Sequence, residues 1–212
     1  MFFYKNDIED VDIVEEIPDY PVNLFLSGSG YFKKITPQSL RMSSEQKLKE
    51  GDSIIIHKEA TNLTELLFFT DKCQVYKSRA SAFDDTKASV LGDYVPAKLG
   101  FDEGEELLYM ADTIDYEGYM LFFFENGKAA KVPLKAYETK TNRKKLANAY
   151  SGKSKLCGML YISEDIDIML RSSNGKVIIF NTSLLNPKST RDTIGVQTLS
   201  LIHISEPTRL QL

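Results

Sequence analysis

The side chains of this sequence whose type and spacing indicate a chemical role are the basic ones. Lys and Arg can neutralise phosphates. They are segregated along the chain. Residues 126 to 155 hold nine Lys and Arg and one acid, Glu138, whereas residues 84 to 117 hold ten acids and two bases. The whole chain has 26 Lys+Arg and 30 Asp+Glu, a formal net charge of -4. Because the local field governs attraction to phosphate, this segregation predicts a basic face on an acidic protein.

The other side chains capable of chemistry form no recognisable site. Cys73 and Cys157 belong to no C-x-x-C pair, so we expect buried, reduced thiols rather than a redox or metal role. His57 and His203 are too few for a histidine metal site. No G-x-x-x-x-G-K-[ST] loop is present, and the carboxylates of residues 102 to 106 are expected in a solvated loop. The sequence therefore predicts no catalytic residue, metal site or cofactor in this chain.

Length and composition favour a soluble, cytoplasmic protein with a hydrophobic core. The 212 residues suffice for one or two domains. No apolar run approaches the ~20 residues of a membrane span, and the first residues lack a signal-peptide layout. One Lys and seven acids occupy the first 20 residues, and Pro18 and Pro21 end this segment. We therefore predict that residues 1–21 form an acidic linker.

The elements that must position the basic side chains repeat from residue 22 onward. Four times, a short apolar run ends in a turn and resumes as a strand, which is a β-hairpin signature. The turn positions are Gly30, Cys73, Gly127 and Gly175. Glycine suits such a turn because positive φ costs it nothing. Two landmarks follow in phase: Lys34, Lys77, Lys131 and Ile179 four residues after the turn, and a second glycine at Gly51, Gly92, Gly152 and Gly195.

Repeats of about 40 to 50 residues built from short strands indicate a propeller-like array, in which each unit buries its apolar face against its neighbours. We predict an all-β fold of about four such blades over residues 22–200. A β-rich domain with coincidental hairpins is the alternative. Helix is scarce, and residues 142–150 are the one candidate for a short helical turn, although they fit an exposed loop equally well.

The end of the chain breaks the repeat. Residues 201–212 contain neither landmark, and Ile202 to Arg209 resembles the read-through translation of a sequencing adapter. We expect a non-native or disordered tail over residues 201–212 of a truncated reading frame. A genuine C-terminal strand is the alternative.

The repeats resemble the C-terminal domain of the A subunit of bacterial type IIA topoisomerases, which are DNA gyrase and topoisomerase IV. The likeness covers residues 22 to about 199 and depends on the order and phase of several segments. These are Gly30-Tyr31-Phe32-Lys33-Lys34-Ile35, Lys47-Leu48-Lys49-Glu50-Gly51-Asp52, Phe124 to Pro133, Thr139 to Lys145, and Thr190 to Gln197. The resemblance implies a β-pinwheel, a propeller-like disc whose blades exchange strands and whose basic rim binds and bends duplex DNA. Family members usually have about six blades, so closure of the ring is left open here.

Gyrase carries a box, Gln-Arg-Arg-Gly-Gly-x-Gly, that is needed for wrapping DNA with a positive sense. The corresponding loop here is residues 42–51, in which Gln46, Lys47 and Gly51 are a degenerate remnant. This departure favours a topoisomerase IV-like or divergent gyrase-like protein, and the choice between the two stays open.

The resemblance and the charge pattern together predict sequence-independent binding and bending of duplex DNA. The repeat lysines are expected along one rim, and residues 143–145 form the densest basic loop. The predicted DNA-contacting residues are Lys33, Lys34, Arg41, Lys47, Lys77, Arg79, Lys131, Lys135, Arg143, Lys144, Lys145 and Arg191.

The cleavage and ATPase machinery of such an enzyme lies, by the resemblance, outside this chain, which is not an enzyme on its own. The implied partners are double-stranded DNA, the remainder of the topoisomerase A subunit, and the ATPase subunit, in the cytoplasm at the nucleoid and not at a membrane. The alternative function is a propeller that binds protein partners through its acidic segments and exposed aromatic residues. A propeller-based hydrolase is disfavoured because no nucleophile and base have suitable spacing.

Overall fold

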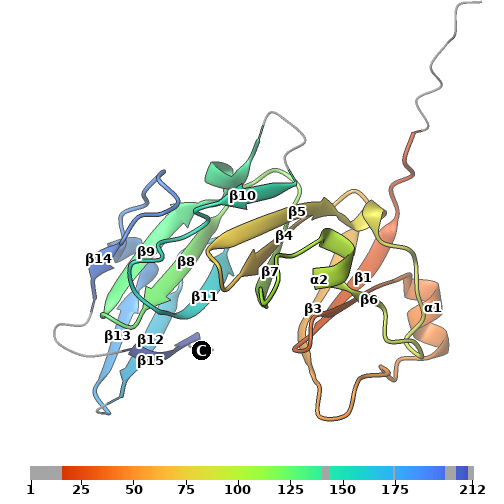
Figure 1. Ribbon diagram of the computed structural model, residues 1–212, viewed down its shortest axis with the longest axis horizontal. Coiled ribbons are helices and arrows are strands. Elements are labelled where there is room, and N and C mark those ends of the chain that lie inside the picture. The colour runs from red at the N-terminus through yellow and green to blue at the C-terminus, as the bar shows by residue number, and fades with distance from the viewer. Residues whose placement is uncertain (1–15, 140–143, 174, 199–203, 210–212) are drawn as a thin grey trace, which may run out of the picture.

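The computed structural model describes residues 16–139, 144–173, 175–198 and 204–209, the last of these by their backbone alone. Its strands form four antiparallel sheets, each built on one of the predicted hairpins (Figure 1). Blade 1 contains β1 (Pro21–Ser27), β2 (Tyr31–Ile35), β3 (Ile54–Thr61) and β6 (Asp93–Tyr94). Blade 2 contains β4 (Glu65–Thr70), β5 (Gln74–Arg79), β7 (Leu107–Thr113) and β10 (Lys145–Ala147). Blade 3 contains β8 (Tyr119–Phe124), β9 (Lys128–Pro133), β11 (Leu156–Ile162) and β14 (Val196–Gln197). Blade 4 contains β12 (Asp167–Ser172), β13 (Val177–Asn181) and β15 (Ile204–Arg209). The predicted all-β array is confirmed.

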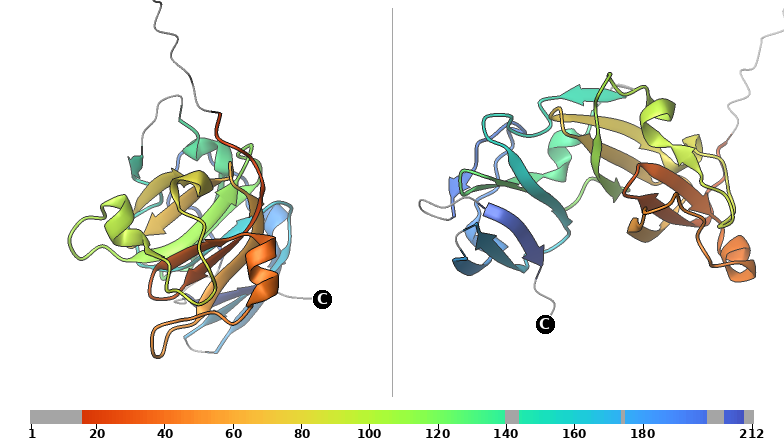
Figure 2. Two further views of the ribbon diagram at one scale, coloured as in Figure 1. Left: turned by 90° about the vertical axis from the view of Figure 1, so that its right-hand side faces the viewer. Right: turned by 60° about the horizontal axis from the view of Figure 1, so that its bottom comes forward.

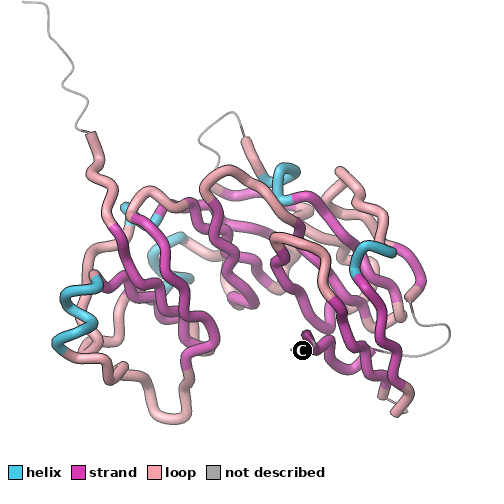
Figure 3. Tube along the Cα trace, turned by 180° about the vertical axis from the view of Figure 1, so that it is seen from behind, coloured by secondary structure: helices cyan, strands magenta, loops and turns pink. Residues whose placement is uncertain are grey.

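Helices are short and lie between strands (Figure 3). They are α1 (Pro37–Met42), α2 (Val95–Leu99) and the 3-10 turns η1 (Ala80–Ala82), η2 (Leu134–Tyr137) and η3 (Thr182–Leu184). The helical turn considered for residues 142–150 is wrong where that segment is described, because Lys145–Ala147 form β10. Within the described part of the chain, no helix is long and apolar enough to cross a membrane.

Each of the first three blades takes its fourth strand from the connection that follows the next hairpin. β6 comes after the β4–β5 hairpin of blade 2 but pairs with β2 of blade 1. In the same way β10 pairs with β5, and β14 pairs with β9. This exchange of strands between neighbours makes the array a β-pinwheel. The four sheets follow one another along an open arc, which is seen in the right-hand view of Figure 2.

The four hairpin turns lie where the sequence predicts them. Gly30, Gly127 and Gly175 have φ of 82°, 77° and 82°, and Cys73 adopts the same left-handed conformation with φ of 55°. An L-residue in this region costs roughly 1–2 kcal/mol. Cys73, whose thiol is free, therefore introduces strain into the second hairpin that glycine would relieve.

The second glycine landmark is only partly a structural repeat. Gly92 and Gly195 occupy equivalent places, each directly before the borrowed strand and with positive φ of 87° and 71°. A β-carbon on either would lie 2.2 Å or 2.1 Å from a carbonyl oxygen of the strand that it faces. In blade 2 the residue directly before the borrowed strand is Lys144, and Lys145, the first residue of β10, lies opposite Tyr76. Gly51 and Gly152 lie elsewhere, in the turn before β3 and in the loop before β11, so the expectation of four equivalent glycines is wrong.

The first strand of each inner hairpin is buried on both faces, because a neighbouring blade covers each side. In β4, Leu66 and Phe68 pack into the core shared with blade 1, whereas Leu67 and Phe69 pack into the core shared with blade 3. β8 is likewise buried from Met120 to Phe124. This explains why both strands are continuous apolar runs without alternation.

Residues 204–209 form a strand rather than the disordered tail expected from the sequence. The β15 backbone pairs antiparallel with β12, from Ile168 opposite Arg209 to Ser172 opposite Ile204. That residues 201–212 are not native to the protein stays a prediction. Of the expected acidic linker, residues 1–15 lie outside the described residues, and residues 16–20 precede β1 without regular structure.

Candidate nucleic-acid interface

Three of the four repeat positions carry a lysine on the second strand of the hairpin, and we call these the repeat lysines. Lys34 and Lys131 are only 3% exposed in their side chains, and Lys77 is 12% exposed. Each ammonium lies near a carboxylate and an aromatic ring. The ion pairs are Lys34 with Asp85 at 3.1 Å, Lys77 with Glu65 at 3.9 Å and Lys131 with Asp165 at 2.5 Å. The rings belong to Tyr20, Tyr116 and Tyr119, with centroids 5.6, 5.0 and 4.4 Å from the nitrogen.

These contacts show that the repeat lysines mainly join segments of the pinwheel. A buried ammonium is tolerated only when it is paired and hydrogen-bonded. Lys34 Nζ also donates to Asn62 Oδ1 at 2.7 Å, and its carboxylate partner Asp85 comes from the connection that follows the β4–β5 hairpin of blade 2. The expectation that Lys34 and Lys131 lie along an exposed rim is therefore wrong.

Lys33 is also internal. Its side chain is buried, and Nζ donates to Gln46 Oε1 at 3.1 Å, to the carbonyl of Lys47 at 2.8 Å and to the carbonyl of Ala88 at 3.1 Å. Burial lowers the pKa of Lys33 from its ordinary value. Lys33 therefore joins the loop of residues 42–51, compared above with the gyrase box, to the connection that contains Ala88 and leads into β6. Its expected place on the exposed rim is wrong.

The remaining predicted DNA-contacting residues are more accessible, except that Arg143 lies outside the described residues. Exposed members are Arg41, Lys47, Arg79, Lys135, Lys144 and Lys145, and Arg191 is half-buried. Several have partners of their own. Lys135 pairs with Glu138 at 2.8 Å, Lys145 pairs with Asp102 at 2.7 Å, and Arg191 Nη1 donates to the Ala136 carbonyl at 3.3 Å. These side chains lie on blades 1, 2 and 3 or on the connections between them.

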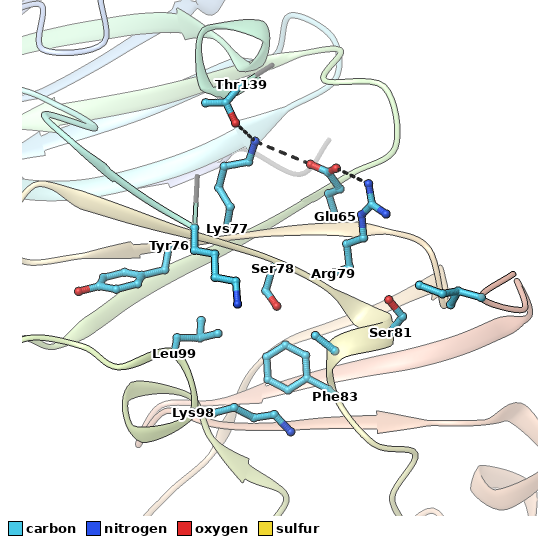
Figure 4. Close-up of a pocket in the computed structure, with 13 residues that line it drawn as sticks. Glu65, Tyr76, Lys77, Ser78, Arg79, Ser81, Phe83, Lys98, Leu99 and Thr139 are labelled. Atoms are coloured by element: carbon cyan, nitrogen blue, oxygen red, sulfur yellow. Dashed lines mark hydrogen bonds and ion pairs between the residues drawn. The ribbon is translucent and has the colours of Figure 1, made fainter. Parts of the chain in front are cut away.

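A pocket of about 710 Å³ opens beside β5, and we call it the inter-blade pocket (Figure 4). β10 pairs with Gln74 to Tyr76, whereas β5 continues to Arg79, so the end of β5 is left without that neighbour. The segment from β5 to Phe83 and helix α2, which follows β6 of blade 1, form its walls.

The described lining of the inter-blade pocket is predominantly basic. It contains four cations, Lys77, Arg79, Lys98 and Lys144, and one carboxylate, Glu65. The hydroxyl-bearing residues Ser78, Ser81 and Thr139 and the apolar Phe83 and Leu99 complete much of the surface (Figure 4). Cations with hydroxyl donors over an apolar floor are suited to an anion with several acceptor oxygens.

Sequence reasoning missed part of this pocket. Lys98 lies in the acidic segment and belongs to no basic run, and the sequence holds no signal that α2 returns to β5. Thr139 lies in a quoted family segment, but its neighbour Lys77 is brought to it only by the exchange of strands between blades 2 and 3.

The acidic segment also differs from expectation. Glu105 is buried, and its carboxylate accepts hydrogen bonds from Thr70 Oγ1, from Tyr76 Oη at 2.7 Å and from the Asp102 amide at 2.9 Å. Burial raises the pKa of Glu105, but the three hydrogen bonds outweigh it and the net pKa is lowered. The prediction of a solvated loop is therefore wrong for Glu105, which instead ties the start of β7 to β4 and β5. Nowhere in the described ranges do three His, Cys, Asp or Glu side chains group as metal ligands.

Comparison with known proteins gives a consistent result. No family model matches the chain. Over 202 residues the sequence is 24% identical to the A subunit of DNA topoisomerase 4 from Staphylococcus aureus, a match that covers 92% of this chain. The chain spans only 25% of the length of that relative.

Solved structures agree with the sequence match. The C-terminal domain of DNA topoisomerase IV superposes with a TM-score of 0.79 at 22% identity, covering 93% of this chain and 63% of that one. The E. coli ParC C-terminal domain gives 0.69 at 14%, covering 90% and 79%, and the DNA gyrase A C-terminal domain gives 0.54 at 16%, covering 89% and 64%. The chain therefore has the β-pinwheel fold of the C-terminal domains of topoisomerase IV and gyrase A subunits, and its relatives in sequence are topoisomerase IV A subunits.

Proposed function

We propose that this chain binds and bends duplex DNA without sequence preference, as the C-terminal part of a type IIA topoisomerase A subunit. The observation that carries the proposal is the match of 92% of the chain to the A subunit of a DNA topoisomerase 4. The cleavage and ATP-hydrolysing residues would lie in other parts of the holoenzyme, and no cofactor is assigned to this chain. Its partners would be DNA, the rest of the A subunit, and the ATPase subunit, at the nucleoid in the cytoplasm.

The distribution of accessible cations supports this proposal. Lys33, Lys34 and Lys131 are withdrawn from the contact set, because their ammonium groups are enclosed by protein. The remaining described members are Arg41, Lys47, Lys77, Arg79, Lys135, Lys144, Lys145 and Arg191. They are spread over three successive blades along the arc. Bending DNA costs of order a few kcal/mol, so several phosphate contacts at once are needed to offset it.

The experiment is a salt titration of the affinity of the 212-residue chain for two unrelated long duplexes. Phosphate recognition requires equal affinities for both sequences and a linear fall of log K with log salt, by about 0.9 for each contact. Bending is measured on the same duplexes as a change in end-to-end distance by energy transfer between terminal dyes. No binding at moderate salt would contradict the proposal and favour the propeller that binds protein partners.

A further inference from the structure

The repeat lysine of blade 2 differs from its counterparts in blades 1 and 3. A carboxylate oxygen lies 3.1 Å from Lys34 Nζ and 2.5 Å from Lys131 Nζ. For Lys77 the corresponding distance, to Glu65 Oε2, is 3.9 Å. Lys77 is thus the repeat lysine whose carboxylate partner lies farthest from its ammonium, and it also lines the inter-blade pocket.

Between blades 1 and 2 the residue type changes at one equivalent position. η1 and η2 follow their hairpins in the same way, with the Ala80 amide donating to the Thr64 carbonyl and the Leu134 amide donating to the Gly118 carbonyl, both at 2.9 Å. Five residues after Ala80 comes Asp85, and five residues after Leu134 comes Thr139. Thr139 Oγ1 lies 3.1 Å from Lys77 Nζ, but a hydroxyl supplies no negative charge.

The one carboxylate in the described lining is shared. Glu65 accepts a hydrogen bond from Tyr116 Oη through Oε2 and lies 3.4 Å from Arg79 Nη2 through Oε1. The charge of Glu138, farther away, also favours the charged form of Lys77. Burial is nevertheless the main influence, and it lowers the pKa of Lys77. Lys98 has its own partner, Asp93, at 2.9 Å. The pocket therefore has more positive than negative charge at Lys77, Arg79 and Lys144.

We propose that the inter-blade pocket binds a phosphate group, held by Lys77, Arg79 and Lys144 and by the hydroxyl of Thr139. The phosphate could belong to the DNA backbone or be free inorganic phosphate, and in its DNA form the inference rests on the function proposed above. Figure 4 shows Lys77 and Thr139 on one wall and Arg79 with Glu65 beside them, so a phosphate there would meet side chains from β5 and the η2 connection together. A multiply charged anion with several acceptor oxygens fits these donors better than a carboxylate does.

Thr139→Asp is the decisive variant, because it gives blade 2 the carboxylate that Asp85 supplies in blade 1. The new carboxylate should pair with Lys77 and exclude phosphate while leaving the melting temperature unchanged or higher. Ser183→Asp, an exposed change of equal charge in η3, is the control. If Thr139→Asp fails to fold, the double variant Arg79→Gln, Lys144→Gln replaces it, since both side chains are exposed.

Two measurements are made on the wild type and both variants of the full chain. The first is the salt dependence of affinity for a duplex, where Thr139→Asp should weaken binding roughly tenfold and reduce the slope by about 0.9. The second is the change in amide chemical shifts with inorganic phosphate, which should be concentrated at residues 77–81 and 139 in wild type and be lost in Thr139→Asp.

The outcomes separate this inference from the proposed function. Phosphate-dependent shifts at the pocket without DNA binding would support the site with free phosphate as its source and contradict the function. A reduced slope without an effect of inorganic phosphate would support the DNA backbone as the source. The inference would be overturned, and the function left standing, by two results together. Thr139→Asp would keep the wild-type affinity and salt slope for DNA, and inorganic phosphate would cause no shifts at the pocket of the wild type. Equal losses in Ser183→Asp would overturn it too, because net charge alone would then explain them.

Discussion

Gly92→Ala tests whether the borrowed strand holds blades 1 and 2 together. Gly92 precedes β6 and has φ of 87°, and an added β-carbon would lie 2.2 Å from the Phe32 carbonyl oxygen and 2.7 Å from Lys33 Cγ. Gly100, which ends α2, is the matched control. It also has positive φ, of 66°, but a β-carbon there would have nothing within 4 Å.

The two substitutions share the cost of placing alanine at positive φ, roughly 1–2 kcal/mol. Only Gly92→Ala must also move β6 away from β2. That displacement disturbs the pairing of Phe32 with Asp93 and of Tyr31 with Tyr94. Each backbone hydrogen bond contributes about 1 kcal/mol. We expect a total loss of about 3–5 kcal/mol for Gly92→Ala against about 1–2 kcal/mol for Gly100→Ala.

Thermal unfolding followed by circular dichroism measures the difference. For a chain of this length 1 kcal/mol corresponds to about 2–4 °C in melting temperature. Gly100→Ala should therefore lower it by about 2–8 °C and Gly92→Ala by about 6–20 °C. Gly195→Ala, with a β-carbon 2.1 Å from the Ala129 carbonyl oxygen, should behave like Gly92→Ala. Equal losses for Gly92→Ala and Gly100→Ala would refute the reasoning, because the close approach to β2 would then cost nothing.

Three further predictions concern charge and the tail. The pKa of Glu105 is lowered, so its contribution to stability is present above the unfolded-state pKa and is lost as pH falls through the folded-state pKa. Glu105→Gln should therefore lower the free energy of unfolding at neutral pH. It should also make that free energy less dependent on pH below about 4.5, as measured by denaturant titrations. Replacing Arg143, Lys144 and Lys145 by Ala should reduce the salt slope of DNA binding by about two units, and by less than three because Lys145 already pairs with Asp102; an unchanged slope would move the DNA path elsewhere. Truncation after Ser200 removes β15 and should change the melting temperature by only a few degrees, because Ile168 and Leu170 of β12 already pack in the core shared with blade 3; a fall of many degrees would show that β15 stabilises blade 4.

The hairpins could be predicted from sequence because their signals are local. A residue able to adopt positive φ, flanked by apolar runs, specifies a turn wherever the rest of the chain goes. The apolar runs of β4 and β8 are local signals of the same kind, but the blades that cover both faces of β4 are known only from the fold. Even Cys73, a poor residue for positive φ, lies at its predicted turn because the flanking strands determine the register.

The borrowed strands could not be predicted in the same way. β6 and β14 contain two residues each, which is too short for any periodic pattern. Their pairing is specified by connections such as residues 84–92, which carry Asp85 to Lys34 and the Ala88 carbonyl to Lys33. Without these pairings, a buried lysine and an exposed one have the same sequence signature, and Lys33 and Lys34 were expected on the surface.

The recurrence of a side chain in a repeat protein therefore has two physical origins that must be separated. A lysine that recurs because every unit must join its neighbour is enclosed by carboxylates, carbonyls and aromatic rings, as Lys34 and Lys131 are. A lysine available to a ligand must lack one of those partners. In blade 2 the Asp85 position is Thr139, and Lys77 faces a pocket. Among the three repeat lysines, Lys77 has the most distant carboxylate, so the departure from the repeat, rather than the repeat itself, is where we propose that an anion binds.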